Sequence, residues 1–291
     1  MNEYSDAGKL YSYTILFILF TSLLGIGNGT DNYIISLAVS QLCLAVPAVV
    51  YLVNKKTDIT KRMGLCKVKP VPVIASVVMG FSVIPFISMI NSISMLFVKN
   101  VTESKVTATA DKYPMWIMLL TVALMPALIE EILYRGIYFG VYRKSGIIKG
   151  ALVAAILFAL MHGNLNQFVY AIVAGFMFAM IDYAGGSVIY SIIMHVIING
   201  VSVVSLYADR LNSEMVNKLA EENVYNSVME VIVDLGPMAA VGLMITGIGY
   251  MIIRKFGNTY EEEKDSGSVI NVFLGVGVVI MVINIIANEI M

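Results

Sequence analysis

Two adjacent glutamates and an arginine, Glu130, Glu131 and Arg135, lie within an otherwise apolar stretch of this sequence. The only two histidines, His162 and His195, follow in two further apolar stretches. A carboxylate can take a proton from a water molecule that an imidazole holds. A second imidazole can stabilise the oxyanion that forms when this water attacks an amide. These residue types therefore favour hydrolysis of an amide bond.

Three pairs of residues are separated by four positions, which places both members of each pair on one face of a helix. The pairs are Glu131 and Arg135, Phe158 and His162, and His195 and Asn199. An ion pair within the helix is therefore available to Glu131 and Arg135. Glu130 lies about 100° away around the same helix, so it can face another environment and remain free for proton transfer.

Each of these residues also has a structural interpretation. Glu131 with Arg135 can be a buried ion pair that only supports the fold. A histidine in a membrane helix is often a hydrogen-bonded core residue, and Asn199 can join two helices, as asparagine commonly does in membranes. Phe158 is expected to pack beside the site rather than to take part in the chemistry.

A bound metal ion is an alternative to metal-free chemistry. Glu130, His162 and His195 are residue types that bind zinc, with a carboxylate as the base. The sequence lacks the HExxH arrangement found in many zinc peptidases. It therefore permits zinc without requiring it, and we expect that no cofactor is needed.

The segment that carries the charges, 115–142, has the length of a membrane span. Each charged side chain costs about 2.5–3.5 kcal/mol at the middle of a membrane helix, whereas each Leu, Ile, Val or Phe returns about 0.3–0.6 kcal/mol. The three charges therefore cost roughly 8–10 kcal/mol, against roughly 4–7 kcal/mol from the twelve such apolar residues. Such a helix is stable only if its charged face lines a polar cavity between helices.

The rest of the chain supplies the neighbouring helices. It is 58% hydrophobic and 13% charged, with a mean hydropathy of +0.83, whereas soluble domains are nearer half apolar and a quarter charged. We predict an all-α polytopic transmembrane bundle of about eight or nine spans. The net charge of −1 gives no indication of nucleic-acid binding. Apolar runs of spanning length occupy 10–26, 33–53, 71–98, 115–142, 147–162, 166–182, 186–206, 235–254 and 268–288.

These runs predict a single integral membrane domain, 1–291, with a catalytic core at 115–206 and flanking spans within 10–98 and 235–288. With nine spans, the N-terminal segment shares one side of the membrane with the loops at 54–70, 143–149 and 254–267. That side carries thirteen basic residues and the other side five. By the positive-inside rule the N-terminus is cytoplasmic.

The candidate residues lie at similar depths. At 1.5 Å per residue, Glu130 and Asn199 are each about 20 Å from the basic side, His162 about 24 Å and His195 about 14 Å. Three helices thus bring polar groups into one slab of the bilayer, which predicts a shared site. Pro126 removes a backbone donor one turn before Glu130, and we expect a bend there.

With these residues in view, the sequence resembles the CPBP family of intramembrane proteases (CAAX prenyl protease and bacteriocin-processing), also called the abortive-infection family. The family motifs EExxxR, FxxxH and HxxxN are matched in order by 130–135, 158–162 and 195–199. The resemblance covers about 115–206 and includes no departure from the three motifs.

The resemblance implies a glutamate-dependent peptidase within a helical bundle. It makes Glu130 the general base and His162 its partner on the attacking water. It assigns oxyanion stabilisation to His195 and Asn199, and it gives the Glu131–Arg135 pair the task of holding the site together.

We therefore expect an intramembrane endopeptidase in the cell membrane of a bacterium, cleaving membrane-associated peptides or protein tails near the cytoplasmic leaflet. Bacteriocin or signalling-peptide precursors fit this expectation, and the oligomeric state stays open. One alternative is a non-catalytic immunity or scaffold protein of the same family. A proton-coupled transporter is disfavoured, because transporters usually contain repeated halves and the buried polar groups here crowd into 130–199.

Overall fold

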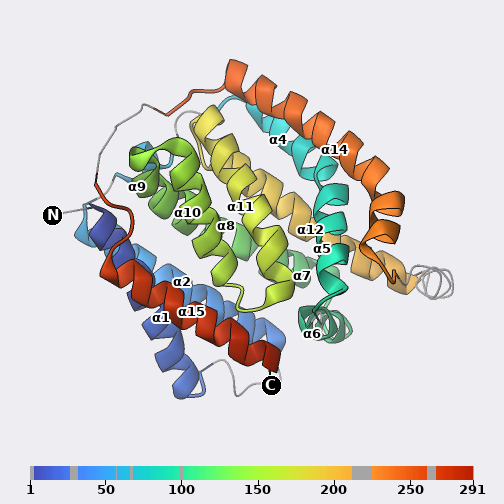
Figure 1. Cartoon of the computed structure of the whole chain (residues 1–291), viewed down its shortest axis with the longest axis horizontal. Coiled ribbons are helices and arrows are strands. Elements are labelled where there is room, and N and C mark those ends of the chain that lie inside the picture. The colour runs from blue at the N-terminus through green and yellow to red at the C-terminus, as the bar shows by residue number, and fades with distance from the viewer. Residues whose placement is uncertain are drawn as a thin grey trace.

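The computed structural model describes residues 3–26, 32–56, 58–65, 68–98, 101–211, 225–260 and 267–290. Within these ranges the chain forms helices and no strand, which confirms the predicted all-α bundle (Figure 1). The helices are α1 (Glu3–Leu23), α2 (Tyr33–Asn54), α3 (Ile59–Arg62), α4 (Pro70–Ser82), α5 (Ile84–Met95), α6 (Val101–Ala110), α7 (Met115–Met118), η2 (Leu119–Leu124), α8 (Met125–Glu131), η3 (Ile132–Phe139), α9 (Gly140–Tyr142), η4 (Arg143–Ser145), α10 (Ile147–Leu160), α11 (Leu165–Gly185), α12 (Ile189–Leu211), α14 (Val228–Phe256) and α15 (Val272–Ile290).

Seven of the nine predicted runs coincide with helices that are long and apolar enough to cross a membrane. These are Tyr33–Asn54, Pro70–Met95, Met115–Ser145, Leu165–Gly185, Ile189–Ala208, Val228–Phe256 and Val272–Glu289. The other two runs form α1 and α10. At 14 residues, α10 is about 21 Å long, shorter than the roughly 30 Å hydrocarbon layer. The first turns of α1 carry Glu3, Asp6 and Lys9, which lowers its apolar character.

The basic loops and the N-terminal helix meet at one end of the bundle. Lys55 pairs with Asp6 at 2.5 Å, and Lys144 with Glu3 at 3.1 Å. The hydrogen bond from Lys55 to Asp6 raises the pKa of this lysine, so the lysine remains charged at neutral pH. We call this the basic end.

The loops at the basic end are also joined to one another through their backbones. The Val188 amide donates to the Met63 carbonyl at 3.1 Å, and the Asn258 amide to the Gly185 carbonyl at 2.9 Å. Gly186 adopts a φ of +75°, and a Cβ there would lie 1.5 Å from the Asn258 carbonyl oxygen. Glycine is therefore required where these loops cross.

The remaining turns lie at the opposite end. Asn32 donates to the Tyr113 hydroxyl at 2.7 Å, and Asn288 donates to the Gly163 carbonyl at 2.9 Å. In the described ranges, the N-terminal helix and the three basic loops therefore lie at one end of the bundle. The side of the membrane that this end faces stays a prediction.

The α10–α11 hairpin occupies the centre of the bundle (Figure 1). On one side of it lie α1, α2 and α15, with α15 packed along α1. On the other side α14 packs against α4 and α5. The segment Met115–Ser145, here called the central helix, runs behind the hairpin and carries the two glutamates.

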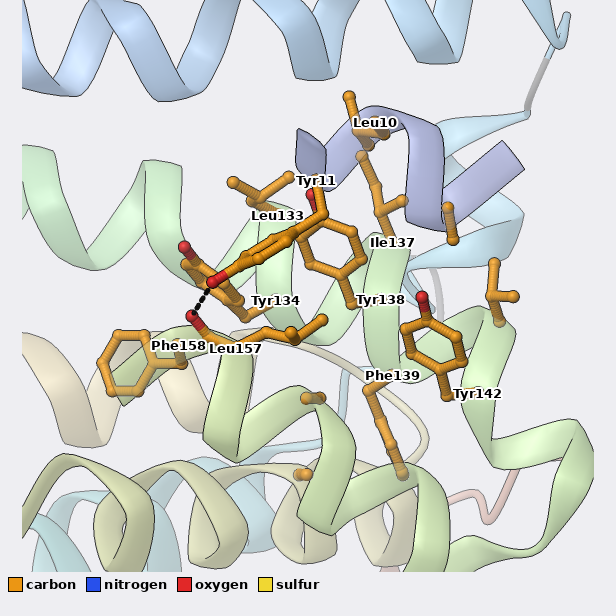
Figure 2. Close-up of a cluster of buried hydrophobic side chains, with 14 of the residues drawn as sticks. Leu10, Tyr11, Leu133, Tyr134, Ile137, Tyr138, Phe139, Tyr142, Leu157 and Phe158 are labelled. Carbon is orange, nitrogen blue, oxygen red and sulfur yellow. Dashed lines mark hydrogen bonds between the residues drawn. The ribbon is translucent and has the colours of Figure 1, made fainter. Parts of the chain in front are cut away.

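Tyrosines pack the part of the central helix that follows Glu131 (Figure 2). Tyr134, Tyr138 and Tyr142 repeat every four residues, with ring centroids 5.6 and 6.4 Å apart. Tyr11 of α1 meets Tyr138 edge-on at 5.9 Å, and its hydroxyl contacts the Leu157 carbonyl of α10 at 3.5 Å. All four tyrosines are fully buried. They pack the charged helix against α1 and α10, and thereby set the position of the glutamates one turn away.

Candidate active site

A cavity of about 380 Å³ lies between α2, α11, α12 and the central helix. All four residues predicted to be catalytic line it, so the polar groups of three motifs meet as their depths predicted. Its polar lining consists of Tyr33, Ser40, Gln41, Glu130, Tyr134, His162, Gln167, Tyr170, His195, Asn199 and Ser202. Apolar side chains such as Leu37, Leu44 and Ile87 complete the wall.

Glu130 faces this cavity from the end of α8. Its Oε2 lies 3.9 Å from Nε2 of His195. This distance is too long for a hydrogen bond, but it is one that a water molecule can bridge. Its Oε1 accepts a hydrogen bond of 2.9 Å from the amide nitrogen of Gln41. The base candidate is therefore anchored through one oxygen, and its other oxygen faces the imidazole.

Glu131 has a different environment, because it is completely buried. Its Oε1 accepts from Arg135 at 3.0 Å, which is the predicted ion pair. The same oxygen lies 2.8 Å from Nδ1 of His195. A carboxylate can only accept, so Nδ1 carries the hydrogen and Nε2 is the ring nitrogen turned toward Glu130. Glu131 thus orients His195, a contact that the motif spacing did not reveal.

Phe158 lies at the centre of the site. The Arg135 guanidinium stacks over its ring at 4.5 Å and over the Phe178 ring at 5.1 Å. The Phe158 ring meets His162 and His195 almost perpendicularly, with centroids 4.8 and 6.0 Å apart. One aromatic ring therefore packs against the buried cation and both imidazoles at once.

His162 follows the last turn of α10. Its Nδ1 lies 3.0 Å from the Phe158 carbonyl. This oxygen can only accept, so the hydrogen is on Nδ1 and Nε2 remains free to accept a hydrogen bond from water. The chain then turns at Gly163, and the Asn164 side chain accepts from the Gln167 amide at the start of α11. Asn164 thus has the backbone-capping role that residues at a helix break often have.

Asn199 binds the central helix. Its side-chain nitrogen donates to the Val122 carbonyl at 3.4 Å. In an α-helix this carbonyl would accept from the amide four residues on, but that residue is Pro126, which has no N–H. The sequence predicts a bend at Pro126; the structure places the wide π-helical turn η2 immediately before it and a second one, η3, after Glu131.

The alternative zinc set is not assembled as a ligand cluster. Among the described residues, no group of three or more His, Cys, Asp or Glu side chains is arranged to hold a metal ion. Glu130, His162 and His195 share the cavity without converging on one such point.

The sequence analysis does not identify two buried polar residues. Asp182 is completely buried and accepts from the Ser191 backbone amide at 3.0 Å and from its hydroxyl at 2.7 Å. Gln41 was not singled out at all. It is a lone amide within an apolar run, about 21 Å from Lys55 along α2. This depth is similar to that of Glu130, and it is the sequence signal that indicates a shared site.

Comparison with known proteins agrees with this geometry. Residues 112–201 match the family model described as "Rce1-like: Type II CAAX prenyl endopeptidase Rce1-like". No curated protein and no solved structure matched the chain. The matched segment contains all three motifs. Residues 112–201 of this membrane protein are therefore similar to the CAAX-type, or CPBP, protease family.

Proposed function

We propose that this protein is an intramembrane endopeptidase that hydrolyses peptide bonds of membrane-associated peptides or protein tails. One observation carries the proposal: Glu130, His162, His195 and Asn199, from three helices of the family-matched segment, line one cavity. Charges and amides are expensive inside a membrane and are retained mainly for function. The substrate expectation follows from the family resemblance and from the partly apolar lining.

Water activation would start at Glu130 and His162. Oε2 of Glu130 takes a proton from a water molecule whose other hydrogen is held by Nε2 of His162. The hydroxide oxygen bonds to the scissile carbonyl carbon, and the carbonyl oxygen becomes an oxyanion. When this intermediate collapses, the C–N bond breaks and Glu130 returns its proton to the leaving amine.

The oxyanion would be stabilised by His195. Its Nδ1–H is held by the buried carboxylate of Glu131 at 2.8 Å. Once Nε2 has taken a proton from solvent, before the attack, this carboxylate stabilises the resulting imidazolium, whose Nε2–H can donate to the oxyanion. Asn199 would supply a second donor by turning its amide away from the Val122 carbonyl, a contact that is long at 3.4 Å. A preorganised donor of this kind contributes about 10²–10³ in kcat.

The setting of this activity is part of the proposal. We propose that the basic end, and with it the N-terminus, faces the cytoplasm of a bacterial cell; the positive-inside rule supports this orientation. Precursors of bacteriocins or signalling peptides are the proposed substrates. The alternative is a non-catalytic immunity or scaffold protein. The internal bonds of Glu131, Arg135 and Asn199 are compatible with it, because they would also stabilise an inactive fold.

One substitution separates the two functions. Peptidomic comparison of cells with and without the protein identifies cleaved peptides, and a quenched fluorogenic peptide spanning the cleavage site is then used with purified protein in nanodiscs. We expect Glu130→Gln to remain folded and to lose cleavage. Glu230→Gln, which changes an exposed glutamate at the start of α14, is the matched control and should retain it. Undiminished cleavage by purified Glu130→Gln would end the catalytic assignment.

The same assay addresses the metal. We propose a mechanism without a metal ion, so prolonged dialysis against a chelator should leave the rate unchanged. Loss of cleavage that zinc restores would instead assign Glu130, His162 and His195 as ligands.

A further inference from the structure

Gln41 is a buried amide in a helix outside the family-matched segment. It lies near the middle of α2 and is 3% exposed. Its helix is otherwise apolar from Leu42 to Tyr51. Burying an unpaired amide costs about 1–3 kcal/mol in proteins, so a glutamine at this depth must be compensated by a specific contact.

The contact is with the candidate base. The amide nitrogen of Gln41 donates to Oε1 of Glu130 at 2.9 Å. Among the described residues, no other side chain or backbone group donates a hydrogen bond to Glu130. Hydrogen bonds to a carboxylate are roughly twice as strong as those between neutral groups. Gln41 therefore determines which oxygen of Glu130 turns toward His195.

The other end of the Gln41 amide has no partner. Its Oε1 is buried, and no donor from the described part of the chain reaches it. An acceptor left in this state costs about 1–3 kcal/mol. Gln41 also lines the 380 Å³ cavity beside Glu130. A peptide in that cavity brings backbone N–H groups, which are the donors that this oxygen lacks.

We infer that α2 contributes a positioning residue to the active site. Gln41 holds Glu130 through its amide nitrogen and accepts a backbone N–H of the substrate, next to the scissile bond, through its amide oxygen. The inference rests on the proposed endopeptidase function. It joins substrate binding to the orientation of the base, because one rigid amide group makes both contacts.

Gln41→Met tests the first contact with a side chain of similar length and no donor. A misplaced base lowers kcat by about 10- to 100-fold, and we expect a loss in this range with the fluorogenic peptide. Leu42→Met changes the neighbouring residue on α2, which is exposed and lies outside the cavity lining, and should stay within about twofold of wild type. If wild type cleaves, Glu130→Gln does not and Gln41→Met keeps the wild-type kcat, the proposed function stands and this inference fails.

Gln41→Glu gives a readout that a structural role would not produce. A protonated carboxyl can donate to Glu130 as the amide does, whereas an ionised one repels it. Activity of Gln41→Glu should therefore be retained at low pH and be lost as the pH rises. The other side chains of the site are the same in both proteins, so the ratio of the variant rate to the wild-type rate isolates the new group. A ratio independent of pH would contradict the positioning role, even if Gln41→Met folds poorly.

The second contact is tested on the substrate. Replacing the backbone N–H beside the scissile bond with an ester oxygen removes the donor. For wild type, kcat/KM should be about 10-fold or more lower with this ester peptide than with the amide peptide. For Gln41→Met, kcat/KM should be the same with the two peptides. An equal loss in both proteins would overturn the proposed contact between Gln41 and the substrate.

Discussion

Two neighbouring glutamates show how adjacent positions on one helix face different environments. Glu131 is completely buried and shares a single oxygen between Arg135 and His195. Glu130, about 100° away around the helix, lines the cavity. The spacing of four residues predicted the first ion pair. It could not predict the His195 contact, which depends on how α12 packs against the central helix.

Glu131→Gln should therefore destabilise the protein, unlike Glu130→Gln. The amide retains an acceptor but removes the negative charge, so the buried guanidinium of Arg135 is left uncompensated. Breaking a buried ion pair from one side costs about 3–5 kcal/mol. Unfolding in mixed micelles would measure this loss. Equal stability of Glu131→Gln and wild type would show that the stacked rings of Phe158 and Phe178 suffice to hold the cation.

At the level of the helix, Pro126 and Asn199 act as one unit. The proline removes the N–H that would pair with the Val122 carbonyl, and Asn199 of α12 donates to that carbonyl instead. The irregular winding of the central helix therefore creates an acceptor that docks a second helix. Irregular helices in membranes are tolerated where a neighbouring helix satisfies the freed groups.

A double-mutant cycle tests this coupling. Asn199→Leu alone should cost about 0.6–1.7 kcal/mol, the range for polar contacts between membrane helices. In a Pro126→Ala background the Val122 carbonyl regains its own helical donor, so the same change should cost less. Ser202→Ala, one turn further along α12, is the control and should behave alike in both backgrounds. Equal losses of stability for Asn199→Leu in the two backgrounds would show that Asn199 and Pro126 are not coupled.

Local sequence predicts the elements better than their partners. Long apolar runs determine helices, and spacing of four determines a helix face, so the bundle and the shared cavity follow from the sequence. The π turns, the burial of Asp182 and the contact of Gln41 with Glu130 do not follow. The contact of Gln41 with Glu130 joins residues 89 positions apart in the chain, and one sequence carries no direct record of such contacts.

In the molecule as a whole, the cavity extends toward the end of the bundle opposite the basic end. The N-terminal segment and three basic loops lie at the basic end. Val106 and Val203 of the cavity lining lie toward the end opposite the basic end, where they pack into one cluster beside Tyr207. Tyr207 contacts Ala110 and Tyr113 there. The expectation of cleavage near the cytoplasmic leaflet therefore needs a test of its own, since this geometry favours entry from the opposite side.

Cysteine labelling in intact cells provides that test. Ser40 and Ser202 line the cavity and are exposed, so Ser40→Cys and Ser202→Cys should react with a membrane-impermeant maleimide added outside. Lys144→Cys, at the basic end, should react only after permeabilisation, because the positive-inside rule places that end in the cytoplasm. Both native cysteines are replaced by alanine beforehand. Labelling of all three variants from one side would contradict a cavity that opens away from the basic end, and exchange of the two patterns would reverse the proposed orientation.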